Sequence, residues 1–147
     1  MSQPPTADRI RDFLAGDTFA VVGASTDREK YGNKVLRCYL QHGLDAHPIN
    51  PKSAHVEGRT AYSDLAALAS TLGRPIHGVS IITPPAISLK VIEDAARAGV
   101  KRVWMQPGAE SPQAIQRAEE LGLQPIAGGP CLLVVLGYDD RWAPPLA

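Results

Sequence analysis

Short, largely apolar runs alternate with amphipathic stretches along almost the whole chain, and few folds accommodate that alternation. The apolar runs cover residues 18–22, 45–49, 78–82, 102–105 and 124–127. Runs of this kind are typical of parallel strands that are buried on both faces. Because parallel strands need crossover connections, which are right-handed, we predict an α/β fold. It is a doubly wound, Rossmann-like sheet of five parallel strands with helices on both faces.

The stretches between these runs carry helix start and stop signals. We expect helices over about residues 33–42, 64–72, 87–99 and 112–121. Ser63 is a candidate cap for the second of these, and Ser111 followed by Pro112 is a typical start for the last. A leading helix over 7–15, capped by Thr6, is expected within residues 1–16. We predict one domain over residues 1–147, with residues 137–147 as a C-terminal tail.

The composition excludes several classes of protein. Of 147 residues, 44% are hydrophobic and 20% are charged, which excludes wholesale disorder. Lys and Arg number 15, as do Asp and Glu, so the basic excess of a nucleic-acid binder is missing. Cys38 and Cys131 are too few for a disulfide framework. No secretory signal is visible and the longest apolar run covers only residues 131–136, so we expect a cytoplasmic protein without a membrane segment.

In a sheet of this type, ligands bind outside the carboxyl ends of the strands. The segments expected there are rich in Gly, Pro and small polar residues, and none contains a carboxylate. They are Gly23-Ala24-Ser25, Asn50-Pro51-Lys52, Thr83-Pro84-Pro85, Gln106-Pro107-Gly108 and Gly128-Gly129-Pro130-Cys131. We therefore expect the ligand site among these five segments.

The first of these segments is a glycine turn between a strand and a helix. Gly23 lets the backbone approach a phosphate, and the following helix start offers free N–H donors. The next glycine is Gly32, so the spacing matches neither GxGxxG nor a P-loop. Two interpretations stay open: a nucleotide-type site, or a glycine required only by the geometry of a tight turn.

The end of the second strand indicates which nucleotide would fit. NAD-binding domains usually carry Asp or Glu there, whereas this chain has Asn50-Pro51-Lys52. A lysine favours an additional phosphate, as in NADP or coenzyme A, although Lys52 taken alone is also compatible with a solvated loop residue. Arg28, Lys30 and Lys34 in the first connection would add to a basic rim, with Asp27 and Glu29 among them.

Several of these segments together resemble a known family. Val21-Val22-Gly23-Ala24-Ser25, Gly32, Pro48-Ile49-Asn50-Pro51, Thr83-Pro84-Pro85 and Val103-Trp104-Met105-Gln106-Pro107-Gly108 are similar to the motifs of small stand-alone CoA-binding proteins. Those proteins are similar to the CoA-binding domain of the succinyl-CoA synthetase alpha subunit and of ADP-forming acyl-CoA synthetases. The resemblance extends from about Thr18 to Leu136.

The resemblance implies a binding site for coenzyme A or an acyl-CoA. Gly23, Ala24 and Ser25 would line the phosphate site, and Lys52 would reach the nucleotide phosphates. Thr83 and Pro84 would border adenine and ribose, and Gln106 and Gly108 would lie toward the pantetheine. The full predicted set is Gly23, Ala24, Ser25, Lys34, Asn50, Pro51, Lys52, Thr83, Pro84, Gln106, Gly108 and Cys131.

This chain departs from the family pattern at two places. Family members often have Arg where this chain has Thr83, which removes one expected phosphate contact. Many also carry polar residues after the cysteine near the C-terminus, whereas Cys131 is followed here by Leu132-Leu133-Val134-Val135-Leu136. Cys131 is then either a reactive thiol, able to pair with the thiol of CoA, or a small buried hydrophobe.

No catalytic constellation is visible. His42, His47, His55 and His77 are scattered without metal-ligand spacing. In the synthetases the phosphohistidine lies in a second domain, so the resemblance implies binding without turnover. Two alternatives remain: an NADP-dependent oxidoreductase-like domain, and an interaction protein with a vestigial pocket. The sequence predicts no metal site, and it specifies neither a protein partner nor an oligomeric state.

Overall fold

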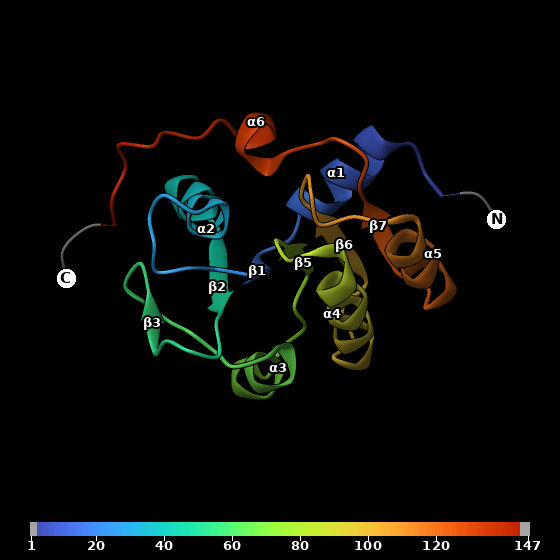
Figure 1. The fold of residues 1–147 in the computed structure, drawn as a ribbon, viewed down its shortest axis with the longest axis horizontal. Helices are drawn as coiled ribbons and strands as arrows, with labels where there is room; N and C mark the ends of the chain where they lie inside the picture. Colours follow the sequence, from blue (N-terminus) through green and yellow to red (C-terminus); the bar gives the residue numbers. More distant parts are fainter. Residues whose placement is uncertain (1–2, 145–147) are drawn as a thin grey trace.

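The centre of the molecule is a sheet of five parallel strands (Figure 1). The computed structural model describes residues 3–144. The strands, in spatial order, are β2 (Asp45–Ile49), β1 (Thr18–Val22), β5 (Gly78–Ile81), β6 (Arg102–Met105) and β7 (Gln124–Ile126). The predicted doubly wound sheet is confirmed. Because the chain proceeds outward from β1 to β2 and then in the other direction from β5 to β7, the topological switch point lies between β1 and β5.

Helices cover both faces of this sheet (Figure 1). One layer contains α1 (Thr6–Leu14), α2 (Tyr31–Gln41) and α6 (Leu132–Leu136). The other contains α3 (Leu65–Leu72), α4 (Pro85–Arg97) and α5 (Pro112–Glu120). Among residues 3–144, no helix combines the length and the apolar character needed to cross a membrane.

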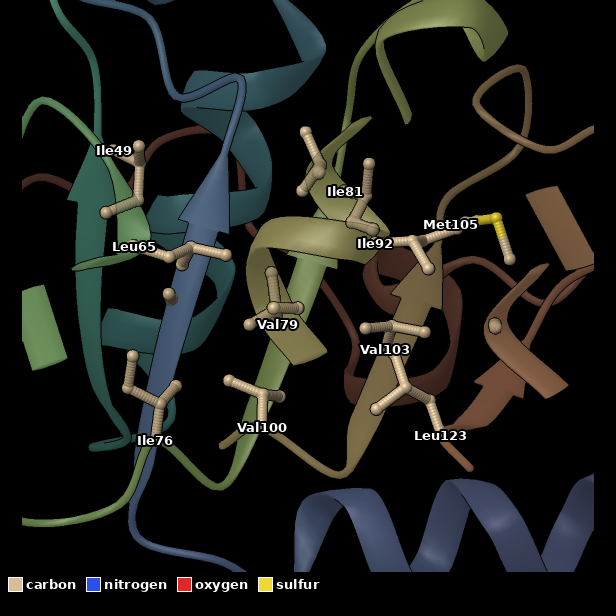
Figure 2. Packing of buried hydrophobic residues seen from close by; sticks show 14 of the residues in the cluster. Ile49, Leu65, Ile76, Val79, Ile81, Ile92, Val100, Val103, Met105 and Leu123 are labelled. Atoms are coloured by element: carbon tan, nitrogen blue, oxygen red, sulfur yellow. The ribbon is translucent and has the colours of Figure 1, made fainter. Parts of the chain in front are cut away.

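The apolar core is divided by the sheet into two clusters. Figure 2 shows the cluster on the α3, α4 and α5 side, where Val79, Ile81 and Val103 of the strands pack with Leu65 and Ile92 of the helices. These side chains are almost completely buried. Each one stabilises the fold by about 1.5–3 kcal/mol relative to an exposed position.

The cluster on the opposite face is aromatic. Phe13 of α1 stacks on Phe19 with ring centroids 5.4 Å apart and meets Trp104 edge-on, also at 5.4 Å. Phe19 in turn stacks on Tyr39 of α2. The indole N–H of Trp104 donates to the carbonyl oxygen of Pro130 at 3.0 Å, which ties the segment before α6 to the sheet.

One predicted helix cap is confirmed and another is wrong. The Ser111 side chain accepts a hydrogen bond from the Ala114 amide at 3.1 Å, as predicted, and Pro112 is the first residue of α5. At α3, however, the cap is Asp64 and not Ser63, because the Asp64 carboxylate accepts from the Ala67 amide at 2.8 Å. Both residue types are good caps, and only the backbone position selects between them.

Two other helix starts differ from the prediction. Thr6 lies inside α1, which begins after Pro5 without a side-chain cap. Helix α2 begins at Tyr31, two residues before the expected Asn33, and Lys30 occupies its cap position without a side-chain hydrogen bond.

The connection from β2 to α3 contains a hairpin that the sequence did not suggest. Strand β3 (His55–Val56) pairs antiparallel with β4 (Arg59–Thr60) through a turn at Glu57 and Gly58. Both turn residues have positive φ, +50° and +77°. Positive φ at both central residues is the conformation of the tight hairpin turn that follows the twist of the strands.

Candidate functional site

A cleft opens at the carboxyl ends of β1, β2 and β5, beside the switch point of the sheet. Its volume is about 400 Å³, and the starts of α3 and α4 close its other side. It is lined by Val22, Gly23, Ala24, Ile49, Asn50, Pro51, Lys52, Ser63, Asp64, Leu65, Thr83, Ile87, Lys90, Val91 and Asp94. Six of the predicted site residues therefore lie on one concave surface: Gly23, Ala24, Asn50, Pro51, Lys52 and Thr83. Ser25, also a predicted site residue, lies outside this lining, and Pro84 lines a smaller neighbouring cleft.

The turn after β1 has no room for a side chain. Gly23 has a φ of +99°, and a Cβ atom there would lie 2.0 Å from the carbonyl oxygen of Ile82. A Cβ atom at Gly32 would lie 1.9 Å from the carbonyl oxygen of Gly23. Gly23 is therefore required by its positive φ and by the neighbouring backbone of Ile82, and Gly32 by the close approach of α2 to this turn, whether or not a ligand binds there.

Two asparagines hold the segment that follows, which we call the β1–α2 loop (residues 23–30). The Asn50 side-chain amide donates to the carbonyl oxygen of Ala24 at 3.0 Å, and that of Asn33 donates to the carbonyl oxygen of Ser25 at 2.8 Å. Within residues 3–144, the backbone amides of Ser25 and Thr26 donate to no acceptor. The loop thus has fixed carbonyl groups, and the amides of Ser25 and Thr26 are among its free N–H groups.

The predicted basic rim does not come together. Lys52 lines the cleft, whereas the Arg28 guanidinium pairs with Glu57 at 3.4 Å and Lys34 pairs with Asp140 at 3.8 Å. Lys34, a predicted site residue, lies outside the lining of the cleft. The second cation of the cleft is Lys90 of α4, which the sequence analysis missed because nothing distinguishes it from an ordinary exposed helix residue.

Acidic residues also line the cleft, although the strand ends contain none. Asp64 caps α3, and Asp94 of α4 forms an ion pair with Lys90 at 3.2 Å. Asp64 directly precedes α3 and Asp94 lies within α4, so a survey of strand ends did not find them. The cleft therefore has cations and carboxylates at its mouth and an apolar floor that includes Val22, Ile49 and Leu65.

A smaller cleft of about 250 Å³ lies between the ends of β5 and β6. It is lined by Ile82, Thr83, Pro84, Pro107, Gly108 and Ala109. Thr83 lines both clefts, and its hydroxyl lies 2.8 Å from that of Ser88 in α4. The structure thus brings Thr83, Pro84 and Gly108 together beside the main cleft.

Gln106 and Cys131 lie on the lining of neither cleft. Gln106 is completely buried, and its side-chain oxygen accepts from the Leu132 amide at 2.9 Å and the Tyr31 hydroxyl at 3.1 Å. The Cys131 thiol, which is half-buried, lies 2.8 Å from the same hydroxyl. Burial, together with the contact to Cys131, raises the pKa of Tyr31 well above its usual value. Burial also raises the pKa of Cys38, to about 12.

Known proteins of similar sequence and fold match most of the chain. A family model described as a CoA binding domain matches residues 17–137. A conserved hypothetical protein from Pyrococcus furiosus is 32% identical with a TM-score of 0.74, over 82% of this chain and 99% of that chain. A hypothetical protein from Pyrococcus horikoshii OT3 is 28% identical with a TM-score of 0.78, over 91% of this chain and 94% of that chain.

A larger protein contains a similar unit. The dinucleotide-forming acetyl-coenzyme A synthetase 1 of Ca. Korarchaeum cryptofilum, in complex with phosphate and ADP, is 29% identical with a TM-score of 0.65. The match covers 76% of this chain but only 25% of the synthetase. The likeness therefore concerns one part of that enzyme.

Proposed function

The chain belongs to the CoA-binding domain family, and on that premise we propose that it binds coenzyme A or an acyl-CoA in the cleft beside β1, β2 and β5. The observation that carries the proposal is the meeting of Gly23, Lys52 and Thr83 on one concave surface at the switch point of the sheet. Ligands of doubly wound sheets bind at this point. A volume of about 400 Å³ is within the range of small-molecule sites.

The charge of the cleft suits a ligand with phosphate groups. Lys52 and Lys90 are both exposed at its mouth, and their ammonium groups can approach a phosphate on a flexible stem. The free amides of Ser25 and Thr26, in the loop that borders the cleft but outside its lining, are further donors for an anion. Because Asp94 competes for Lys90, we assign the main phosphate contact to Lys52.

The apolar floor suits the uncharged parts of the same ligand. Val22 and Ile49 lie at the strand ends, while Ile87, which is 51% exposed, and Val91 face the cleft from α4. Burial of apolar surface there favours an adenine ring or a pantetheine chain over free phosphate.

The test is isothermal titration calorimetry with CoA, acetyl-CoA, NADPH and ATP on the full chain, together with thermal denaturation in the presence of each ligand. We expect CoA to bind and to raise the melting temperature, since a ligand that binds only the folded state stabilises it. Lys52→Glu should weaken binding by about ten-fold or more, because it replaces a charge-assisted contact by repulsion. Lys101→Glu, an exposed residue beside the amino end of β6, makes the same change of charge away from the cleft and should leave affinity unchanged.

Three outcomes would contradict the proposal. Absence of CoA binding at millimolar concentration would overturn it and favour an interaction protein with a vestigial pocket. Tighter binding of NADPH than of CoA would favour the oxidoreductase-like alternative. Equal effects of Lys52→Glu and Lys101→Glu would exclude the cleft as the binding site.

A further inference from the structure

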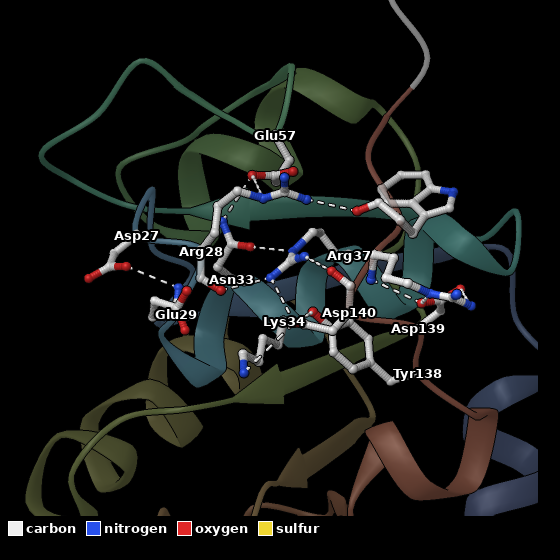
Figure 3. Close-up of polar contacts among 12 residues, drawn as sticks. Asp27, Arg28, Glu29, Asn33, Lys34, Arg37, Glu57, Tyr138, Asp139 and Asp140 are labelled. Atoms are coloured by element: carbon white, nitrogen blue, oxygen red, sulfur yellow. Dashed lines mark hydrogen bonds and ion pairs between the residues drawn. The ribbon is translucent and has the colours of Figure 1, made fainter.

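Arg37 of α2 is a buried arginine that donates hydrogen bonds to three parts of the chain (Figure 3). Its side chain is only 2% exposed. The guanidinium donates to the Asn33 side-chain oxygen at 2.6 Å, the Arg28 carbonyl at 2.7 Å and the Asp140 carbonyl at 3.1 Å. A buried charge is costly unless it is paired and hydrogen-bonded, so these contacts require Arg37 to hold one geometry.

One of these contacts reaches the C-terminal segment, residues 138–142. The Asp140 carboxylate lies 3.6 Å from the guanidinium of Arg37, and the Tyr138 ring centroid lies 5.5 Å from its central carbon. Hydrogen bonds in both directions join Asp139 to Gln41, at 2.5 and 3.0 Å. The segment is thus attached to the outer side of α2 although it belongs to neither the sheet nor a helix layer.

The same carboxylate keeps its charge under ordinary conditions. A hydrogen bond from the Tyr138 hydroxyl, together with the nearby cations Lys34 and Arg37, lowers the pKa of Asp140 below its usual value. The C-terminal segment therefore supplies the negative charge that balances Arg37.

The other contacts of Arg37 reach the β1–α2 loop. Arg37 binds the Arg28 carbonyl directly, and it binds the side-chain oxygen of Asn33, whose amide holds the Ser25 carbonyl at 2.8 Å. The Asn33 amide also donates to the Glu57 carboxylate at 3.1 Å. Asn33 and Arg37 thereby hold two carbonyl groups of the loop, those of Ser25 and Arg28, and within residues 3–144 the amides of Ser25 and Thr26 have no acceptor.

We propose that Arg37 is a positioning residue for the ligand cleft: it is held by the C-terminal segment and in turn orients the β1–α2 loop. The inference rests on the proposed function, because the loop borders the cleft through Gly23 and Ala24. Arg37 itself does not line the cleft, so its effect on a ligand passes through Asn33 and the Arg28 carbonyl. The segment after α6 is thus part of the ligand site without touching the ligand.

A purely structural role for Arg37 makes a different prediction from a positioning role. A structural role lowers global stability and leaves the affinity of the folded protein unchanged. A positioning role loosens the loop and weakens binding even where the rest of the protein stays folded. Lysine at position 37 keeps the charge but has no planar fork, so it cannot reproduce three contacts in three directions.

The experiment combines hydrogen exchange of the ligand-free full chain with calorimetric titration of CoA. The variants are Arg37→Lys and, as a surface change that spares the fold, Asp140→Ala. The control is Arg11→Lys, an exposed arginine of α1 paired with Asp8. Amides of β6 serve as an internal measure of global opening.

For Arg37→Lys we expect faster exchange at the amides of Asp27, Glu29 and Lys30, unchanged exchange in β6, and CoA binding weakened about ten-fold. Asp140→Ala should change exchange and affinity in the same direction by a smaller factor, and Arg11→Lys should change neither. Unchanged loop exchange and affinity in Asp140→Ala, and in Arg37→Lys if it folds, would overturn the inference. If the unaltered protein binds no CoA, the proposed function fails, and the loop exchange still decides whether Arg37 positions the loop.

Discussion

The first turn of α2 rests directly against the turn that ends β1: a Cβ atom at Gly32 would lie 1.9 Å from the carbonyl oxygen of Gly23. Gly32 is a helical residue whose φ lies outside the left-handed region, so the requirement for glycine comes from the neighbouring backbone and not from its own conformation. This contact sets the distance between α2 and the strand ends, and with it the position of the β1–α2 loop.

Gly32→Ala should therefore destabilise the protein. In an unobstructed helix this substitution stabilises by about 1 kcal/mol. Here the backbone must move to admit the methyl group, which costs about 1–3 kcal/mol or more. Urea denaturation measures the difference, with Ser70→Ala at an exposed position of α3 as the control for helix propensity. A Gly32→Ala protein as stable as the original would refute the contact.

The cap of α3 gives a second prediction. Asp64→Ala removes the hydrogen bond to the Ala67 amide and should lower the free energy of unfolding by about 0.5–2 kcal/mol. Ser63→Ala, one residue earlier, should have almost no effect, since Ser63 makes no cap contact. Thermal denaturation of the two variants side by side tests the assignment, and a larger effect at Ser63 would reverse it.

His47 provides a pH dependence of stability. Burial lowers the pKa of His47, and the nearby guanidinium groups of Arg59 and Arg74 act in the same direction, although Asp45 opposes them. The unfolded chain, in which the histidine pKa is about 6.5, therefore takes up a proton first as the pH falls. The free energy of unfolding should be highest above that pH and should decrease below it until the folded pKa is passed.

Denaturation between pH 8 and pH 5 measures this dependence. In His47→Gln the decrease that begins near pH 6.5 should be smaller than in the original protein. His55→Gln, at an exposed position of β3, is the matched control and should retain the full decrease. Equal pH profiles for His47→Gln and the original protein would contradict the assignment.

Replacing Thr83 by arginine should increase the affinity for CoA. Thr83→Arg places a guanidinium at the junction of the two clefts, where the family resemblance led us to expect arginine, and should tighten CoA binding about three- to ten-fold. The gain should shrink as salt is raised. Thr83→Gln has a long side chain without the charge and serves as the control. Titration calorimetry at two salt concentrations measures the affinity of both variants for CoA. An equal increase in affinity in Thr83→Arg and Thr83→Gln would exclude the charge as the cause.

Much of the sheet could be predicted because its signals are local. The predicted strand over residues 18–22, a continuous apolar run, is β1, and the one over 45–49 is β2. The glycine turn after β1 was recognised for the same reason. Glu57 illustrates the opposite case, because it adopts positive φ in a hairpin turn and its carboxylate contacts Asn33 and Arg28. No local sequence pattern predicts these contacts.

The sequence alone determined the fold class, the strand ends at which we expect the ligand, and the resemblance that suggested CoA, because each depends on short stretches of neighbouring residues. Only the tertiary structure decided which cations line the cleft. Lys52 and Lys90, which are 38 positions apart in the sequence, both line the cleft, whereas Lys34 forms an ion pair with Asp140. Charge interactions act through space and are screened over roughly 8–10 Å at ordinary salt concentrations, so their partners are set by the packing of helices and not by distance along the chain.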